Sequence, residues 1–281
     1  MRDKIGTFAR RITIKLKHIA QIKYSKGDFD YIHANDLIRT GQFSNVRIVD
    51  DKLIVGIRES ELVARLYPHS DCFTLKQVFL QNEYQPLVSM FESNQLQKQR
   101  LKIIDAGANV GYTSAFLFSE FPDAEIVCVE PDRENMQILQ LNLSHFLKNG
   151  QLKTYERGLM AEDGKAIALD RGFRDGLDHS LSVVEGSADS ELRSVSIATI
   201  MREMRWDSID MLKIDIEGSE RFVFGEGVTT AFLSKVRTIA IEIHDEFHIR
   251  GTIYQKLRDN GFVLFDSGET TFGLNTRFVG E

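Results

Sequence analysis

The chain has 281 residues, of which 42% are hydrophobic and 27% charged, and its formal net charge at pH 7 is −6. This composition is typical of a soluble globular protein, and the acidic balance disfavours nucleic acid as a partner. No run approaches the ~20 apolar residues that span a bilayer, and the only two cysteines, Cys72 and Cys128, exclude a disulfide framework and indicate a reducing compartment such as the cytoplasm.

Positive charge is concentrated at the start of the chain. Residues 1–26 contain eight Lys or Arg and one Asp, and the spacing of Phe8, Ile12, Leu16 and Ile19 predicts one apolar face of a basic helix. Such a helix can lie on an anionic membrane surface, which would make the protein peripheral to the membrane. We favour the alternative, in which the helix packs its apolar stripe on the body of the protein, because most charged runs are solvated faces.

The next segments predict a small N-terminal extension. In "FSNVRIVDDKLIVGIRE" two alternating apolar runs flank Asp50-Asp51, which predicts a β-hairpin. The segment "DCFTLKQVFLQNEYQPLVSMFES" predicts a helix interrupted at Pro86. We therefore expect a helical and hairpin extension over residues 1–69 and a larger domain over residues 70–281.

From residue 101 onward, predicted strands and helices alternate. The predicted strands are 101–107, 124–131, 152–159, 209–218 and 235–244, and the predicted helices are 112–121, 132–150, 196–204, 219–227 and 248–261. Strands separated by helices indicate right-handed crossovers and a mostly parallel sheet covered on both faces. The last two strands, 262–265 and 271–279, are joined by too few residues for a parallel crossover, so one of them should run antiparallel.

A glycine-containing turn follows the first of these strands, in "IDAGANVGYTSA". Gly107 and Gly111 have no Cβ, so a ligand can approach the backbone closely. The free N–H groups of the helix that begins near Tyr112 favour an anionic group such as a carboxylate. Glu130 stands at the end of the next strand, where a carboxylate suits the two hydroxyls of an adenosine ribose. The turn and the acid together predict a nucleoside-cofactor site.

The spacing of the glycines discriminates between cofactors. It is G-x-x-x-G and not the G-x-G-x-x-G that brings a backbone against a pyrophosphate. Asp105 would repel a pyrophosphate but can accept hydrogen bonds from an ammonium group, directly or through water. A cofactor with an amino-acid end and a ribose end fits both acids, and S-adenosylmethionine is such a cofactor.

Four ionisable residues follow two later strands and are candidates for catalysis. By strand period, Asp215 and Glu217 share one side of "KIDIEGSE", and Glu242 and His244 share one face of "IEIH". An alcohol acceptor must lose a proton during methyl transfer, so we predict His244 as the general base. Asp215 and Glu217 would orient it or bind the acceptor hydroxyl.

Other interpretations of these residues stay open. Asp215, Glu217 and Glu242 could instead bind Mg²⁺ or another divalent ion, which we favour less because carboxylate clusters also occur without metal. Glu242 and His244 could also simply satisfy buried polar groups at a strand end.

Several sequence blocks resemble the signature blocks of FkbM-type S-adenosylmethionine-dependent methyltransferases. They are "IDAGANVGYTSA", "VCVEPD", "MLKIDIEGSE" and "IAIEIH", and the resemblance runs from about residue 70 to the C-terminus. It implies an α/β fold of the Rossmann-like class I methyltransferase type, with a seven-stranded sheet. It also implies mostly O-methylation of natural products or saccharides, so the acceptor would be a small molecule or a saccharide.

The resemblance also implies roles for individual residues. The methionine end of the cofactor would lie against Asp105, Gly107, Asn109 and Gly111. Glu130 would bind the ribose, Pro131 and Asp132 would flank the adenosine, and Gly158 of "RGL" would lie near the adenine. Phe79, Glu83 and Tyr84 would close over the cofactor.

Two other functions remain as alternatives. A nicotinamide-dependent oxidoreductase is opposed by the glycine spacing and by Asp105. A binding protein that keeps the cofactor fold without catalysis is opposed by the intact acids of "DIEGSE" and by His244. The polar segment 160–195 predicts irregular loops or a small hairpin, and its residues Arg171, Arg174, Asp178 and His179 could form a substrate lid.

Overall fold

The computed structural model describes residues 13–15, 17–18, 25–57, 60–94, 100–170 and 182–279. The chain divides into two compact units, Met1–Cys72 and Phe73–Glu281. Two groups of predicted residues lie outside the described residues: the apolar helix face of Phe8, Ile12, Leu16 and Ile19, and the lid candidates Arg171, Arg174, Asp178 and His179. Among the described helices, none combines the length and the apolar character needed to cross a membrane.

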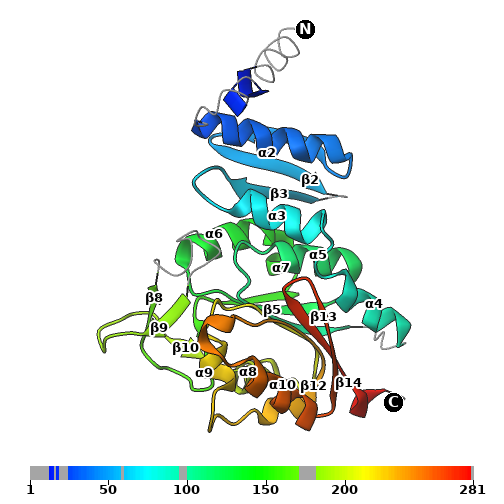
Figure 1. Cartoon of the computed structure of the whole chain (residues 1–281), viewed down its shortest axis with the longest axis vertical. Helices are drawn as coiled ribbons and strands as arrows, with labels where there is room; N and C mark the ends of the chain where they lie inside the picture. Colours follow the sequence, from blue (N-terminus) through cyan, green and yellow to red (C-terminus); the bar gives the residue numbers. More distant parts are fainter. Residues whose placement is uncertain are drawn as a thin grey trace. The chain divides into compact units, whose positions relative to one another are not determined.

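From residue 25 onward, the first unit folds as helix α2 and a three-stranded antiparallel sheet (Figure 1). Its elements are α2 (Lys26–Thr40), β1 (Ser44–Val49), β2 (Lys52–Ile57) and β3 (Ser60–Arg65). The predicted hairpin is confirmed as β1 and β2, and both turn residues, Asp50 (φ 45°) and Asp51 (φ 60°), adopt the left-handed conformation that such two-residue turns require. Helix α2 and strand β3 were not predicted, because their apolar residues are few and irregularly spaced.

The second unit is built on a seven-stranded sheet in the order β13-β14-β12-β11-β4-β5-β6. The strands are β4 (Lys102–Ala106), β5 (Glu125–Val129), β6 (Leu152–Tyr155), β11 (Ile209–Ile214), β12 (Val236–Glu242), β13 (Phe262–Ser267) and β14 (Thr270–Asn275). Neighbouring strands from β12 to β6 are parallel, and β14 runs antiparallel to both β12 and β13. The predicted Rossmann-like α/β fold, with a mostly parallel seven-stranded sheet and one antiparallel C-terminal strand, is confirmed.

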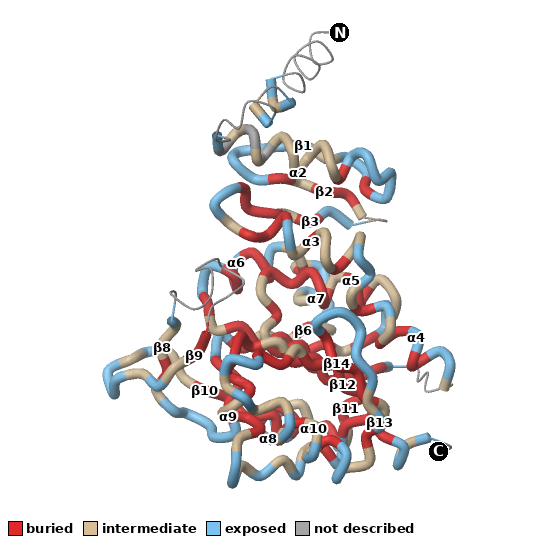
Figure 2. Tube along the Cα trace, viewed as in Figure 1, coloured by how far each residue is buried: buried red, intermediate tan, exposed pale blue. Residues whose placement is uncertain are grey.

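Helices cover both faces of this sheet. They are α4 (Gln85–Ser93), α5 (Tyr112–Glu120), α6 (Arg133–Asn142), α7 (Ser144–Lys148), α8 (Ile197–Met204), α9 (Glu220–Phe224) and α10 (Arg250–Asp259). Figure 1 shows α4, α5 and α6 on one side of the sheet and α8, α9 and α10 on the other. Strands β4, β5, β11, β12 and β14 are buried along most of their length (Figure 2), whereas β13 is largely exposed. One face of the sheet packs on apolar side chains of α8, α9 and α10.

Three predicted elements are divided in the structure. The helix expected around Pro86 is two helices, α3 (Asp71–Phe79) and α4, and Pro86 lies in the first turn of α4, where its missing N–H is not needed. The helix expected over 132–150 breaks at the fully buried Leu143 into α6 and α7.

The predicted strand 152–159 divides into β6 and β7 (Gly158–Leu159), and β7 leaves the main sheet to pair with β10 (Ser194–Val195). Between β7 and β10, strands β8 (Ile167–Asp170) and β9 (Ser182–Glu185) form an antiparallel pair.

Candidate functional site

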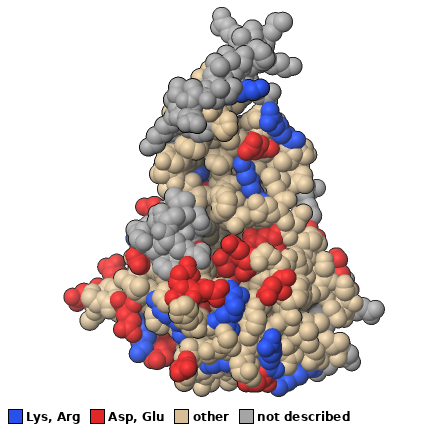
Figure 3. All heavy atoms as spheres, in the orientation of Figure 1, with Lys and Arg blue, Asp and Glu red and all other residues tan. Residues whose placement is uncertain are grey.

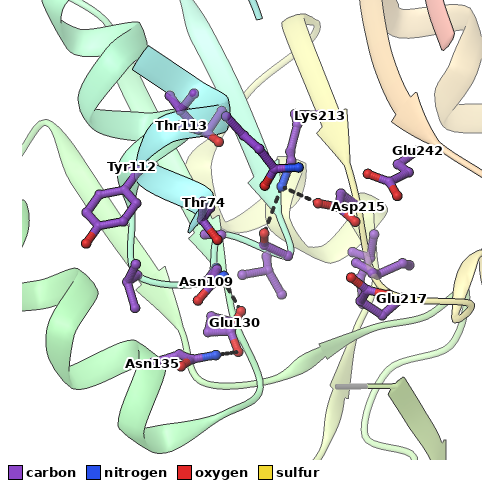
Figure 4. Close-up of a pocket in the computed structure, with 18 of the residues that line it drawn as sticks. Thr74, Asn109, Tyr112, Thr113, Glu130, Asn135, Lys213, Asp215, Glu217 and Glu242 are labelled. Atoms are coloured by element: carbon purple, nitrogen blue, oxygen red, sulfur yellow. Dashed lines mark hydrogen bonds and ion pairs between the residues drawn. The ribbon is translucent and has the colours of Figure 1, made fainter. Parts of the chain in front are cut away.

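A pocket with a volume of about 270 Å³ opens beyond the carboxyl ends of the parallel strands. Ligands of open parallel sheets bind at this edge. The predicted residues that line it are Glu83, Tyr84, Gly107, Asn109, Glu130, Pro131, Gly158, Asp215, Glu217 and Glu242. Residues at the ends of four strands, β4, β5, β11 and β12, therefore meet around one cavity, as Figure 4 shows for the labelled side chains.

The turn after β4 forms one wall of this pocket. Gly107 (φ 78°), Asn109 (φ 49°) and Gly111 (φ 86°) all adopt left-handed backbone conformations, which glycine and asparagine tolerate best. A Cβ at Gly107 would lie 1.6 Å from the carbonyl oxygen of Asp215. Glycine is thus required at position 107 because the turn after β4 lies in close contact with the chain after β11. The sequence alone did not reveal this contact.

Glu130 links this turn to the start of α6. Its carboxylate accepts hydrogen bonds from the backbone N–H of Asn109 (2.9 Å) and of Asp132 (2.9 Å). The amide of Asn135 lies 3.4 Å from the same carboxylate (Figure 4). Burial raises the pKa of Glu130 to about 7, although these hydrogen bonds lower it in part.

Lys213 lies beneath the turn and was not predicted. Its ammonium Nζ donates to the carbonyl of Gly107 (2.8 Å) and lies 3.4 Å from Asp105 Oδ1 and 3.6 Å from Asp215 Oδ2. Burial alone would lower the pKa of Lys213, but the charges of Asp105, Asp215 and Glu83 outweigh it and raise the pKa above the usual range. Lys213 is therefore a fixed cation that ties two turns of the site together.

Carboxylates gather at the other end of the pocket. Asp215, Glu217 and Glu242 lie together across the cavity from Glu130 (Figure 4), and acidic side chains also cluster at the centre of the displayed face (Figure 3). Repulsion from Asp215, with burial as a second cause, raises the pKa of Glu242 to about 8. Burial and then repulsion from Asp215 raise the pKa of Glu83 in the same way. This end of the pocket is suited to a cation.

His244 occupies the centre of the acidic group, but behind the pocket wall. Its side chain is fully buried, with Nδ1 3.1 Å from Glu220 Oε1 and Nε2 3.0 Å from Glu217 Oε2. Burial lowers the pKa of His244, but the hydrogen bonds to Glu217 and Glu220 outweigh it and raise the pKa to about 11. A general base needs a nitrogen open to the acceptor, and here both ring nitrogens face carboxylates. The role of His244 as general base therefore stays a prediction.

The structure thus separates the predicted residues into two groups. Asp105, Gly111, Asp132 and His244 are not among the residues that line the pocket. Asp105 accepts a hydrogen bond from Ser114 (2.7 Å) and lies beside Lys213, while the Asp132 carboxylate caps α6 by accepting from two backbone N–H groups. The side chains of Asp105 and Asp132 therefore support the walls of the pocket.

Strand β11 ends earlier than predicted, before the catalytic candidates. Strand β11 ends at Ile214, so Asp215 and Glu217 do not share a strand face. Glu217 instead reaches the pocket from a turn, with φ 51°. Residues of the pocket that were not predicted include Thr74, Gln77, Tyr112, Asn135, Lys213 and Glu269. Glu269 lies in the short connection between β13 and β14. The length of this connection predicted only that one of the two strands runs antiparallel.

Comparison with known proteins identifies relatives of this chain. A family model described as "Methyltransferase FkbM domain" matches residues 105–264. The AMB antimetabolite synthetase AmbE of Pseudomonas aeruginosa is 26% identical over 178 residues, which are 51% of this chain but only 8% of AmbE. The 31-O-demethyl-FK506 methyltransferase FkbM of Streptomyces tacrolimicus is 23% identical over 197 residues, covering 60% of this chain and 75% of that protein.

Among solved structures, the crystal structure of methyltransferase FkbM from Methylobacillus flagellatus KT is similar, with 18% identity and a TM-score of 0.43. The match covers 63% of this chain and 44% of the other.

Proposed function

Because this chain belongs to the FkbM methyltransferase family, whose domain matches more than half of it, we propose that it transfers a methyl group from S-adenosylmethionine to a hydroxyl oxygen of a saccharide or natural-product-like small molecule. The observation that carries the proposal is the single pocket bounded by the turn 107–111 and Glu130 at one end and by three carboxylates at the other. The first end suits a nucleoside and the second a sulfonium cation.

Each part of the cofactor has a matching group in this pocket. The ribose hydroxyls would donate to Glu130, and the adenine would lie toward Gly158. The methionine end would run along Gly107 and Asn109, where the backbone admits a close approach. Tyr84 and Glu83, which line the same cavity, would cover the cofactor.

The chemistry is an in-line displacement at the methyl carbon. The acceptor oxygen forms the new C–O bond as the C–S bond breaks, S-adenosylhomocysteine leaves as a neutral thioether, and the hydroxyl proton passes to a carboxylate or to water. Carboxylates beside the sulfonium favour binding of the positively charged cofactor. Alignment of the two reactants in one pocket supplies much of the rate.

The choice of a hydroxyl acceptor is supported by a relative. The FkbM protein of Streptomyces tacrolimicus is named for methylation of 31-O-demethyl-FK506, which places its methyl group on oxygen. Only one basic side chain, Lys213, lines the pocket among its described residues, whereas six carboxylates do. A neutral or positively charged acceptor therefore suits the site better than a phosphorylated one.

Methyl transfer to hydroxyl acceptors tests the proposal. The full chain would be incubated with methyl-labelled S-adenosylmethionine and a panel of saccharides and hydroxylated natural products, and products would be assigned by NMR. We expect label on a hydroxyl oxygen of at least one neutral acceptor. Label found only on nitrogen or carbon acceptors would contradict O-methylation.

Cofactor affinity should depend on pH through Glu130. Its pKa is about 7, so the group is mostly protonated at pH 6 and mostly ionised at pH 8. Ribose hydroxyls donate to the ionised form, so protonation competes with binding. We expect the affinity for S-adenosylhomocysteine to be about tenfold weaker at pH 6 than at pH 8. Calorimetric titrations at both pH values check this, and the Glu130→Gln variant should lose the dependence.

A further inference from the structure

The imidazole of His244 is held in one orientation by a buried carboxylate. Its Nδ1–H donates to Oε1 of Glu220 at 3.1 Å, and the same oxygen accepts from the backbone N–H of Ile216 at 3.2 Å. Glu220 and His244 are both 0% exposed. In a histidine that binds a metal ion, the second ring nitrogen usually donates its N–H to a carboxylate or carbonyl oxygen in this way.

The other ring nitrogen faces an excess of negative charge. Nε2 lies 3.0 Å from Glu217 Oε2 and 3.5 Å from Glu242 Oε1. Because Nδ1 already carries a proton, a neutral imidazole would direct the lone pair of Nε2 at these oxygens, which is repulsive. A proton or a metal ion between Nε2 and the carboxylates relieves this repulsion.

A single N–H at Nε2 can point at only one of these carboxylates, whereas a metal ion can bind several of them at once. The nearby ammonium of Lys213 lies against Asp105, Asp215 and the carbonyl of Gly107. Independently, Oδ1 of Asp215 is buried and has no hydrogen-bond partner among the described residues. An oxygen in that state points to a ligand that satisfies it.

We propose that Asp215, Glu217 and His244, joined by Glu242, bind a divalent metal ion at the acceptor end of the pocket. Ligand atoms of Asp215, Glu217 and His244 all lie within 4.8 Å of one another. Bonds of about 2.1 Å to one ion put adjacent octahedral ligands about 3 Å apart. The distance from His244 Nε2 to Glu217 Oε2 is 3.0 Å, and the wider spacings would have to shorten slightly when an ion binds.

The donor set limits the kind of ion. Three carboxylates and one imidazole, without a thiolate, suit a hard or borderline ion such as Mn²⁺ or Mg²⁺ rather than a soft one. Asp215, Glu217 and Glu242 line the pocket, so the ion would face the bound acceptor. The inference rests on the proposed function only for the role of the ion, which would bind the acceptor hydroxyl and lower its pKa.

Titration of the full chain with Mn²⁺, followed by electron paramagnetic resonance, tests this site. We expect one Mn²⁺ per chain, with affinity at least tenfold weaker in Asp215→Asn and in Glu217→Gln. Glu220→Gln removes the charge that anchors the imidazole and keeps an amide oxygen for the N–H groups of His244 and Ile216, so it should weaken binding by about 10–100-fold. Glu269→Gln is the matched control, because Glu269 lines the same pocket but is not one of the three clustered ligands.

The possible outcomes separate the metal site from the proposed function. Circular dichroism and binding of S-adenosylhomocysteine without metal, measured on the same samples, report whether each variant is folded. Cofactor binding without Mn²⁺ binding would overturn the inference and leave the proposed function standing. Equal loss of Mn²⁺ affinity in Glu269→Gln and Glu217→Gln would also overturn it, since only general charge would then matter. Mn²⁺ binding without cofactor binding would support the metal site and contradict the proposed function.

Discussion

The Glu130→Ala variant should bind S-adenosylmethionine at least about 100-fold more weakly than the wild-type chain. Two ribose hydroxyls would each lose a hydrogen bond to a charged acceptor, worth about 1.5–3 kcal/mol apiece. The backbone N–H groups of Asn109 and Asp132 would also lose their acceptor, so the turn beside the cofactor would be less well ordered. Equilibrium dialysis with labelled cofactor measures the change.

Glu134→Ala is the control for this variant. Glu134 is exposed on the first turn of α6 and does not line the pocket, yet its removal changes the net charge by the same amount. We expect its affinity to stay within about twofold of wild type, since the charge of an exposed carboxylate is screened by water and salt. Equal losses in the two variants would contradict the assignment of Glu130 to the ribose.

The second large effect is expected from Gly107→Ala, which should destabilise the chain by about 3 kcal/mol or more. The new methyl group would lie 1.6 Å from the carbonyl oxygen of Asp215, and the residue would also be held at φ 78°. The two turns must move apart, which displaces Lys213 from the Gly107 carbonyl. We expect thermal unfolding to show a melting temperature lower by about 6–12 °C and cofactor binding to be lost.

Gly164→Ala separates the clash from the backbone strain. Gly164 has a similar φ of 71°, but nothing lies within 4 Å of a Cβ placed there. It should therefore show only the cost of a left-handed alanine, about 1 kcal/mol, or about 2–4 °C in melting temperature. Equal melting temperatures for the two variants would show that the contact between the turns is not tight.

Much of the fold follows from patterns that the sequence displays directly. Apolar runs of strand length alternate with helical periodicity after residue 101, and this alone predicts parallel crossovers. The short connection "DSGET" likewise predicts the antiparallel strand β14. The breaks at Leu143 and after Tyr155 were missed, because they depend on tertiary packing and on pairing with a distant strand.

The cofactor end of the site was more predictable than the acceptor end. Glu130 and the glycines stand at the ends of adjacent strands, where topology alone brings them together. Lys213 was missed because it interrupts an apolar strand and acquires its role from register: it pairs with Asp105, more than 100 residues earlier in the chain. Strand alternation does not reveal which residues of two strands lie side by side.

The role of His244 illustrates the same limit. The sequence placed it correctly at the carboxyl edge of the sheet among acids, and a histidine there suggested a base. Its partner Glu220 lies on helix α9, whose sequence "ERFVF" gives no sign of a carboxylate turned into the core. Burial and anchoring of the imidazole, which decide its chemistry, emerge only when the helix packs on the strand.

Calorimetric titration of the full chain with S-adenosylmethionine, S-adenosylhomocysteine and NAD⁺ tests the central claim most directly. The account predicts micromolar binding of the first two at one site per chain and no binding of NAD⁺. Binding of NAD⁺ alone would contradict both the cofactor assignment and the reaction. No binding of any of the three would contradict the cofactor site, and would favour a protein that keeps the methyltransferase fold without its catalysis.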